Sequence, residues 1–509
     1  MAWNFGLEGL IRSNGRLHAA RPALIENGIT ITHAELDRRT ARLARALLAQ
    51  GVNRGDRVAL LLGDGAQFME LVLAAARIGA IAVLLNWRLA PGEIAWAIAH
   101  AAPRLVLRAE RFAGLLAGAD GFADMVVADD PIAVNRYERW ASEGSDMPIP
   151  AVVGGDDPLF MMFTSGTTGK PKGCVHTHGS TLAHAMSFAL RRGFTHADCN
   201  LSINPLFHVA GLGHALATLA VGGANVFVPR GSAPGAPVDL AVRHGCTTTT
   251  LGKPLLEAWA LADADTRSRL HFRTVTTGAG ISDPATFAFV RDLWGATLSG
   301  GWGQTESWSF CTMIDYPDMC EHPKSMGWPI PPIEVTVLDS DGHPIDEPEA
   351  QGELGIRGAN VMLGYWNSPE ATEAALGTGW LRTGDMVSVD RLGLLTLRGR
   401  LKELIKSGGE NVYPAEVEAV LRDLPGVADC AVAGVSDSKW GEAVKAFIVL
   451  EPGAKLDPAA MTNACRQHIA GYKRPRYLEI VAAIPRDPAG KIRRYQLSDR
   501  PVTPDQIVD

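Results

Sequence analysis

Phe163-Thr-Ser-Gly-Thr-Thr-Gly-Lys-Pro-Lys-Gly173 is the stretch from which the rest of the chain can be interpreted. It holds three glycines, four hydroxyl side chains and two lysines within eleven residues. Glycines let backbone N–H groups turn toward one point, where the hydroxyl and ammonium groups can converge. This composition is typical of a loop that binds a polyphosphate. It is not a Walker A loop, because G-x-x-x-x-G-K-[ST] requires Gly where Thr164 stands and Ser or Thr where Pro171 stands. A flexible linker is the alternative, but linkers seldom end in Lys-Pro-Lys-Gly between apolar runs.

Four further motifs follow this loop along the chain. They read Gly301-Trp-Gly-Gln-Thr-Glu306, Trp380-Leu-Arg-Thr-Gly-Asp385, Asp390-Arg-Leu-Gly393 with Gly399-Arg-Leu-Lys-Glu403, and Pro485-Arg-Asp-Pro-Ala-Gly-Lys-Ile-Arg493. In this order the five motifs resemble those of the adenylate-forming (AMP-binding) superfamily, which includes acyl-CoA synthetases, peptide-synthetase adenylation domains and beetle luciferases. They extend over about 330 residues, which argues strongly against a chance match.

Composition limits the class of protein. At 509 residues the chain is longer than a usual single domain, so at least two domains are expected. Apolar residues make up 47% and charged residues 20%, as in an ordinary globular protein. The net charge of −7, without a basic run, argues against a nucleic-acid partner. The seven cysteines are scattered without a C-x-x-C pair, and the first residues lack the pattern of a signal peptide. We therefore expect a cytoplasmic protein with reduced thiols.

The segment 199–229 needs separate attention, because it has no Asp, Glu, Lys or Arg. It is long enough to span a bilayer, but it contains Asn204, Pro205 and two histidines. Buried strands and a packed helix are the better interpretation, so no stable membrane insertion is expected.

The early chain alternates between strand and helix patterns. Residues 56–62 and 81–85 are apolar runs of strand length, residues 66–78 have helical spacing, and Pro91 begins a further helix. Such repeats predict βαβ units, and hence a large layered α/β domain with buried parallel strands.

The pattern changes near residue 400. Residues 412–421 predict a helix entered through Pro414, and residues 427–435 and 443–450 predict strands, which together give a small α+β unit. By the resemblance, this unit is a mobile lid. The predicted division is an N-terminal ATP- and acyl-binding domain over 1–399, a hinge over 400–402 and a C-terminal lid domain over 403–509.

The resemblance implies an ATP site assembled from several motifs. The phosphate loop would hold the β and γ phosphates, Glu306 would ligate Mg²⁺, and Asp385 would accept hydrogen bonds from the ribose hydroxyls. Trp302 would stack on the adenine, where the family more often has Tyr. The residues expected to bind ATP or AMP are Thr164, Ser165, Gly166, Thr167, Thr168, Gly169, Lys172, Gly278, Ala279, Gly280, Trp302, Gly303, Gln304, Thr305, Asp385, Arg400 and Lys491.

Lys491 is the sharpest single prediction for catalysis. By the resemblance it bridges the carboxylate and the α-phosphate, and stabilises the charge that develops during transfer. His208 borders the acyl site in the family's segment and is expected to orient the carboxylate or gate water, and Thr305 and Glu306 complete the catalytic set. Without the resemblance, a histidine beside an apolar run is more often a core residue, and Lys491 belongs to an ordinary basic tail.

The acyl pocket is expected to take a medium-sized, largely apolar acid that is branched, cyclic or aromatic. Gly300 and Gly301 are too small to close its floor, and Trp308 could form one wall. The remaining residues expected to line this pocket are His208, Val209, Gly211 and Leu212.

On the CoA side, Lys406-Ser-Gly-Gly409 resembles the CoA ligases in particular. Gly409 would leave room for the pantetheine arm, Lys406 belongs to the same segment, and Lys473 and Arg476 are expected to meet CoA phosphates. Lys402 is the expected hinge residue. The expected cofactors and partners are ATP, Mg²⁺, coenzyme A and a small carboxylic acid, with a homodimer left open.

The reaction expected from the resemblance is AMP-forming acyl-CoA ligation through an acyl-adenylate. A stand-alone adenylating enzyme that loads a carrier protein in trans is the main alternative. A nucleotide- or acyl-binding protein without catalysis and a luciferase-type oxygenase are weaker ones.

Overall fold

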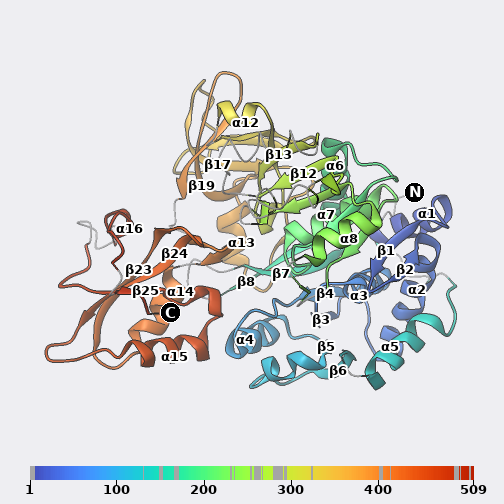
Figure 1. The fold of residues 1–509 in the computed structure, drawn as a ribbon, viewed down its shortest axis with the longest axis horizontal. Helices are drawn as coiled ribbons and strands as arrows, with labels where there is room; N and C mark the ends of the chain where they lie inside the picture. The colour runs from blue at the N-terminus through green and yellow to red at the C-terminus, as the bar shows by residue number, and fades with distance from the viewer. Residues whose placement is uncertain are drawn as a thin grey trace.

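The computed structural model of this chain describes most of its length. It covers residues 6–508 except 130, 148, 150–152, 165–170, 230–231, 234, 253–254, 257–258, 260–264, 266–267, 279–290, 292–294, 323–324, 401–404, 413, 486–491, 493 and 504–505. Within these residues Figure 1 shows a large body and a small C-terminal body, drawn in orange and red, beside it.

A seven-stranded sheet carries the phosphate loop. Its inner strands pair in parallel, whereas β7 and β8 form an antiparallel pair at one side. Its strands in spatial order are β18 (Gly364–Tyr365), β8 (Lys172–Thr177), β7 (Pro158–Thr164), β4 (Ile81–Leu84), β3 (Arg57–Leu61), β5 (Leu105–Ala109) and β6 (Ala123–Ala128).

A thirteen-stranded sheet carries the nucleoside and acyl motifs. It is parallel around β9, β11, β12 and β13 and antiparallel from β13 onward. Its strands in spatial order are β16 (Glu334–Leu338), β17 (Gln351–Arg357), β19 (Leu381–Val389), β20 (Leu395–Arg400), β15 (Ser325–Pro329), β14 (Thr312–Asp315), β13 (Thr297–Trp302), β12 (Thr274–Thr277), β11 (Thr248–Leu251), β9 (Cys199–Ser202), β10 (Ala224–Phe227), β1 (Pro22–Glu26) and β2 (Ile29–Thr32).

Helices pack on these two sheets. In the large body they are α1 (Leu7–Leu17), α2 (His33–Ala49), α3 (Ala66–Arg77), α4 (Pro91–Ala101), α5 (Pro131–Ser142), α6 (His178–Arg192), α7 (Val209–Ala220), α8 (Ala236–His244), α12 (Asp318–Glu321) and α13 (Pro369–Leu376), with short 3-10 turns η1 (Glu110–Leu116) and η2 (Thr305–Ser307). Their ends follow local chemistry. Thr177 caps α6 by accepting from Ser180 N, and Gly193 ends it in the left-handed region at φ 62°.

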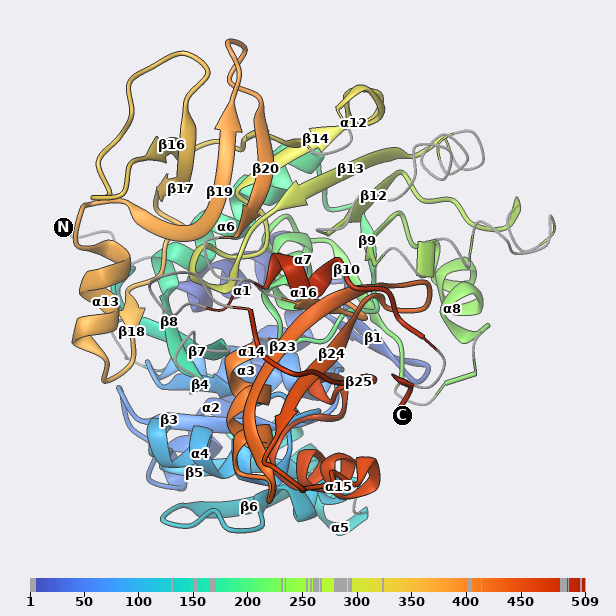
Figure 2. The same ribbon diagram turned by 90° about the vertical axis from the view of Figure 1, so that its left-hand side faces the viewer.

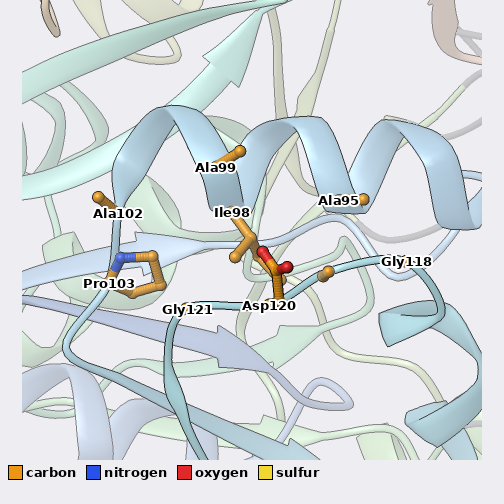
Figure 3. A pocket seen from close by; sticks show the side chains of 9 residues that line it. Ala95, Ile98, Ala99, Ala102, Pro103, Gly118, Asp120 and Gly121 are labelled. Atoms are coloured by element: carbon orange, nitrogen blue, oxygen red, sulfur yellow. The ribbon is translucent and has the colours of Figure 1, made fainter.

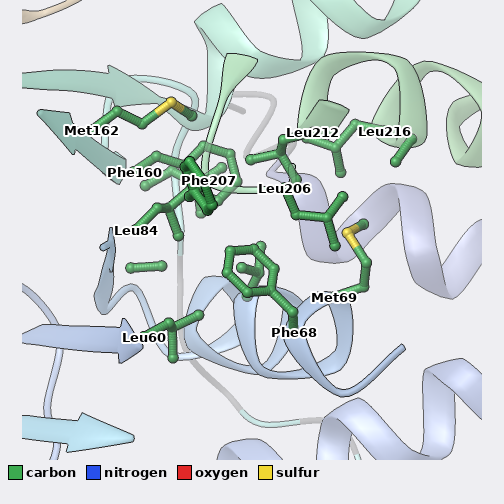
Figure 4. Packing of buried hydrophobic residues seen from close by; sticks show 14 of the residues in the cluster. Leu60, Phe68, Met69, Leu84, Phe160, Met162, Leu206, Phe207, Leu212 and Leu216 are labelled. Carbon is green, nitrogen blue, oxygen red and sulfur yellow. The ribbon is translucent and has the colours of Figure 1, made fainter. Parts of the chain in front are cut away.

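The main core lies between the parallel strands and the helices α3 and α7. Figure 4 shows Phe68, Leu84, Phe160, Phe207 and Leu212 converging there, and each of these side chains is buried. Burial of such apolar side chains contributes about 1.5–3 kcal/mol each, and this packing holds β7 and the start of α7 in fixed positions.

The small body is built on a five-stranded sheet. Its strands are β22 (Glu410–Val412), β21 (Ile405–Ser407), β24 (Gly441–Leu450) and β23 (Val427–Asp437) in spatial order, with β25 (Tyr477–Ile480) also paired to β24. The helices α14 (Pro414–Arg422), α15 (Pro458–His468) and α16 (Tyr495–Ser498) and the turn η3 (Gly471–Lys473) complete it. The chain leaves the thirteen-stranded sheet after β20 and enters this sheet at β21, which supports the proposed division near residues 400–402.

The predicted architecture is confirmed. The α/β class with a layered large domain and a small α+β domain is observed, and the uncharged segment 199–229 forms the packed elements β9, α7 and β10. One element differs, because Val412 ends β22 and the helix begins only at Pro414. A proline disfavours helical conformation in the residue before it, so a helix entered through Pro414 starts at the proline itself.

Candidate active site

The phosphate loop is held at both ends by a strand pair. Thr164 ends β7, Lys172 begins β8, and these two residues are partners in the antiparallel ladder. The intervening predicted residues Ser165, Gly166, Thr167, Thr168 and Gly169 lie outside the described residues. The Lys172 ammonium lies over the ring of Tyr365, 4.7 Å from its centroid.

Glu306 is connected to Lys172 through Tyr365. It sits in η2, where the Tyr365 hydroxyl donates to Glu306 Oε1 at 2.8 Å. Tyr365 is in β18, which pairs with β8, so Lys172, Tyr365 and Glu306 form a continuous row. The structure therefore brings together a cation and a carboxylate that are 134 positions apart (306 − 172 = 134).

A buried histidine fixes the turn that carries Glu306. His176 Nε2 in β8 donates to the carbonyl of Thr305 at 2.6 Å. Burial lowers the pKa of His176 to about 4, against the opposing effect of that hydrogen bond, so its ring is neutral near pH 7. Sequence reasoning missed both His176 and Tyr365, because neither belongs to a motif and their roles come only from strand pairing.

The nucleoside side is centred on Trp302 and Asp385. The indole N–H of Trp302 donates to Asp385 Oδ2 at 2.8 Å, and both residues are buried. Asp385 is the register partner of Arg400 in β20, whose side chain is not described. Gly278 follows β12 next to β13, whereas Ala279 and Gly280 lie outside the described residues. Trp302 thus fixes the carboxylate of Asp385, which is expected to bind the ribose. The sequence predicted that Trp302 stacks on the adenine, but it did not predict this hydrogen bond.

The turn after Trp302 requires a glycine. A Cβ at Gly303 would clash with the carbonyl of Ser309. The backbone at these two residues can therefore approach this closely only because residue 303 has no side chain. Gln304 and Thr305 follow in this turn and lead directly to Glu306. The glycine therefore shapes the segment that presents the carboxylate.

His208 lies at the start of α7 as its N-cap residue. Its ring packs on Phe207 at 4.6 Å, and its side chain is 42% exposed. Val209 begins the helix and Leu212 is fully buried. A Cβ at Gly211 would clash with the backbone of Pro205, so this glycine allows the turn before α7 to pack closely.

The glycines of β13 do not leave an opening on their Cβ side. A Cβ at Gly300 would clash with Met319, and a Cβ at Gly301 would lie 2.6 Å from Phe310. We expected these two glycines to leave the floor of the acyl pocket open. On the side where their Cβ atoms would lie, this expectation is wrong, because other side chains fill the space. Glycine is needed at both positions because β13 packs closely against α12 and against the segment after η2.

Trp308, two residues after Glu306, is fully buried. Its ring stacks on His184 of α6 at 5.1 Å with 6° between the planes, and it meets Phe160 edge-on. Its backbone has φ 66°, which is unusual for a bulky residue and is tolerated because the surrounding rings hold it. His184 Nε2 in turn contacts Ser309 Oγ at 3.1 Å.

The CoA-side turn of the small domain reaches the large domain. Gly408 and Gly409 join β21 to β22 with φ of 58° and 83°, a two-residue hairpin turn that favours glycine at both positions. Trp440 crowds the Cβ side of Gly408, whereas the Cβ side of Gly409 is open. Lys406 in β21 is held through its backbone N–H, which donates to Glu442 at 2.7 Å.

Glu410 connects this turn to His208 and Arg88 of the large domain. Its carboxylate pairs with Arg88 of the large domain and lies 3.2 Å from His208 Nε2. Burial alone would raise the pKa of Glu410, but the hydrogen bond and charge of His208 and the Arg88 guanidinium outweigh it and lower the pKa to about 2. Sequence reasoning gave no role to Glu410, and nothing in the sequence indicated Arg88.

Lys473 does not occupy the predicted position beside CoA. Its side chain is 3% exposed, and its ammonium lies 2.6 Å from Glu93 and 2.9 Å from Glu416. The prediction that it meets a CoA phosphate is therefore wrong for this structure, because two carboxylates already neutralise it away from solvent. Arg476 instead lies over the ring of Trp440 at 5.0 Å, beside the Gly408 turn.

Two further predicted residues are not described. Lys491 and the hinge residue Lys402 both lie outside the described residues. Their predicted roles therefore stay predictions.

Other features of the described residues do not compete with this site. No described helix is long and apolar enough to cross a membrane. No group of three or more His, Cys, Asp or Glu among them could hold a metal ion. A cavity of about 280 Å³ lies between α4 and the turn at 118–121 (Figure 3), but none of its lining residues is a predicted site residue.

Comparison with known families supports the motif pattern. Residues 11–366 match the family described as AMP-binding enzyme, and residues 416–491 match the family described as AMP-binding enzyme C-terminal domain.

Individual relatives cover nearly the whole chain. The chain is 34% identical to a feruloyl-CoA synthase of Amycolatopsis sp., over 98% of this chain and 99% of the relative. It is 34% identical to the long-chain-fatty-acid–CoA ligase FadD13 of Mycobacterium tuberculosis, over 93% of each chain.

Two solved structures of one enzyme differ in their similarity to this chain. The o-succinylbenzoate CoA synthetase (MenE) of Bacillus subtilis, a double mutant bound with its product analogue OSB-NCoA, gives a TM-score of 0.84 at 30% identity, covering 96% of this chain and 98% of that one. The same enzyme in complex with its acyl-adenylate intermediate OSB-AMP gives 0.70 at 30% identity, covering 97% and 98%.

Proposed function

This chain belongs to the AMP-binding enzyme family, and we propose that it is an AMP-forming acyl-CoA ligase. In the first half-reaction a carboxylate oxygen attacks the α-phosphorus of ATP, and the bond to pyrophosphate breaks. In the second, the thiol sulfur of coenzyme A attacks the acyl carbon, the bond to AMP breaks and the thiol loses its proton. The observation that carries the proposal is the Gly408–Gly409 turn, whose neighbour Glu410 contacts His208.

The ATP groups of the first half-reaction fit the row formed by Lys172, Tyr365 and Glu306. The loop and Lys172 bind the β and γ phosphates, and Asp385, fixed by Trp302, accepts from the ribose hydroxyls. Only one oxygen of Glu306 is engaged by Tyr365, and a single carboxylate plus substrate phosphates is a usual environment for Mg²⁺. When bound there, this ion neutralises phosphate charge. Lys491 provides the cation at the α-phosphate.

The present arrangement of the domains fits the second half-reaction. The Gly408–Gly409 turn stands at the acyl site, and the fold is more similar to MenE with a CoA product analogue than to MenE with an acyl-adenylate. The open side of Gly409 admits the pantetheine arm, and the half-buried pair of Trp440 and Arg476 flanks its approach. Attack by the thiol then takes place beside His208.

The acid is compact rather than a long chain. Trp308 and His184 close the space behind the first turn of α7, where a Cβ at Gly213 would already lie 2.6 Å from His184 Nε2. A medium-sized, largely apolar acid fits this enclosure. Because an apolar pocket discriminates only about 1–3 kcal/mol per methylene, several related acids should be accepted.

We favour coenzyme A over a carrier protein as the acceptor, since the feruloyl-CoA synthase and the CoA ligase FadD13 are each 34% identical to this chain and match nearly its whole length. The reducing cytoplasm is the proposed location, because all seven cysteines are free thiols.

A two-part assay tests this function. Acids from acetate to palmitate, together with benzoates, are assayed for ATP–pyrophosphate exchange and then for thioester formation with free CoA or with a phosphopantetheinylated carrier. We expect exchange with a medium-sized acid and thioester formation with CoA. Acetate or palmitate as the best substrate contradicts the proposed pocket, and transfer to the carrier alone contradicts the proposed acceptor.

A further inference from the structure

A buried lysine joins the two domains outside the reacting centre. Lys473 lies in η3 of the small domain, and its ammonium is 2.9 Å from Glu416 at the start of α14. The same ammonium is 2.6 Å from Glu93 in the first turn of α4, which belongs to the large domain. All three side chains are at most 10% exposed, so this is a buried ion triad across the domain interface.

The triad carries one positive and two negative charges away from water. Burial would lower the pKa of Lys473, but Glu416, Tyr472 and Glu93 outweigh it and raise that pKa above its ordinary value. Lys473 is therefore charged throughout the physiological pH range. A buried charge that loses a partner costs far more than an exposed one, because neither water nor another group replaces the lost contact.

The two carboxylates that contact Lys473 belong to different domains. Glu416 and Lys473 belong to the same domain, so they stay together if that domain rotates. Glu93 is contributed only by the large domain, and its contact with Lys473 exists only in the orientation seen here. The helices α4 and α15 also touch in this orientation, and Figure 2 shows the small domain in front of the large one.

Glu93 is held in place by its own helix, independently of Lys473. Its Oε2 accepts from the backbone N–H of Ala90 at 2.9 Å and so caps α4, which leaves Oε1 directed to Lys473. A carboxylate fixed by its own helix loses little conformational entropy when the ion pair forms.

We propose that Glu93 and Lys473 form an orientation latch, an ion pair that selectively stabilises the domain arrangement used for thioester formation. This inference rests on the proposed function, in which adenylation and thioester formation use different arrangements. A contact present in one arrangement only shifts the population toward it by its differential free energy. Both residues act as positioning residues, since neither touches the reacting atoms.

Glu93→Gln tests the latch with the least other damage. Glutamine keeps the length and can still cap Ala90 N, but it removes the charge that Lys473 needs. We expect thioester formation from supplied acyl-adenylate and CoA to fall about tenfold or more, as for other close charge pairs at interfaces. ATP–pyrophosphate exchange should stay within about twofold of the unmodified enzyme, since the latch is absent from the adenylating arrangement.

A matched control and a double variant separate the latch from general damage. Glu110→Gln removes another large-domain glutamate from an ion pair, with Arg108, that does not cross the interface, and should leave both half-reactions unchanged. Lys473→Gln should impair thioester formation by a similar factor, and adding Glu93→Gln to it should have little further effect. Independent, multiplying effects of the two changes contradict the latch.

Domain orientation provides a readout that does not depend on CoA chemistry. Nitroxide labels at the exposed positions Leu190 and Lys455, each changed to Cys, report the distance between the large and small domains. Glu93→Gln should add a second distance population, whereas Glu110→Gln should not. An unchanged distance distribution overturns the latch even if the enzyme makes acyl-CoA. If the unmodified enzyme makes no acyl-CoA but Glu93→Gln shifts the distances, the latch stands and the proposed acceptor fails.

Discussion

At the level of single residues, Trp302 shows how a substitution within a motif acquires a second role. Its indole N–H bonds to Asp385, a carboxylate that the resemblance assigns to the ribose. The bond fixes the carboxylate before the nucleotide binds, which lowers the entropy lost on binding. A hydrogen bond to a charged group contributes about 1.5–3 kcal/mol, so its loss should be measurable.

Trp302→Phe is expected to raise the KM for ATP by about tenfold or more, because it removes the donor to Asp385 while keeping an aromatic face for stacking. The maximal rate of ATP–pyrophosphate exchange should change little. Trp328→Phe is the matched control, since Trp328 also donates its indole N–H, to Leu392 O, but outside the site. Equal effects of the two changes on KM contradict the role given to Trp302.

At the level of elements, β8, α6 and α7 bury three histidines, of which His176 and His184 meet the ring of Trp308 and His214 meets Phe188 and Phe194. Burial lowers the pKa of His176 to about 4 and is the main cause that lowers the pKa of His184 and of His214 to about 3. Each ring is neutral in the folded chain, whereas each binds a proton below its ordinary pKa of about 6.5 in the unfolded chain. The helix pair therefore loses stability as the pH falls.

His184→Phe should weaken this acid sensitivity. The folded protein keeps His184 neutral while the unfolded chain protonates it, so His184 lowers the free energy of unfolding by about 1.4 kcal/mol per pH unit between pH 6.5 and 3. Phenylalanine can still stack on Trp308 and does not titrate. Urea unfolding at several pH values from 7 to 4.5 measures the difference. His343→Phe, at an exposed histidine, should leave the pH dependence unchanged, and a similar dependence in both variants would contradict the prediction.

At the level of the whole molecule, the proposed function requires a different arrangement of the two domains for each half-reaction. The Gly408–Gly409 turn stands beside His208 here, through the contact of Glu410 with that residue. Lys491, outside the described residues, has its proposed role at the α-phosphate of the same site. Each needs a face of the small domain to meet the reacting centre, and rotation about a few residues near Lys402 is the ordinary way to exchange such faces.

Separable defects are expected from changes at these two positions. Lys491→Ala should remove most ATP–pyrophosphate exchange and leave thioester formation from supplied acyl-adenylate largely intact. Gly409→Leu should do the opposite, because a side chain fills the open side of the turn and strains a backbone at φ 83°.

Two controls in the same domain accompany these variants. Lys455→Ala removes an exposed lysine, and Gly453→Leu imposes the same strain at φ 80° on an equally open glycine away from the interface. Both should behave as the unmodified enzyme. If Lys491→Ala and Gly409→Leu each impair the two half-reactions equally, alternation between two arrangements does not apply to this protein.

The sequence by itself determined the fold class, the family and the motif residues of the site. Strand and helix periods and glycine-rich signatures are local, so the strands at 57–61 and 81–84, the phosphate loop and the turn before Glu306 could be identified without a structure. Only the tertiary structure decided which partners those residues meet. The bond between Trp302 and Asp385, the support of Thr305 by His176 and the burial of Lys473 between Glu93 and Glu416 join residues far apart in the chain. Such contacts depend on strand register and domain orientation, because these set which side chains share one low-dielectric space, and no local pattern records that.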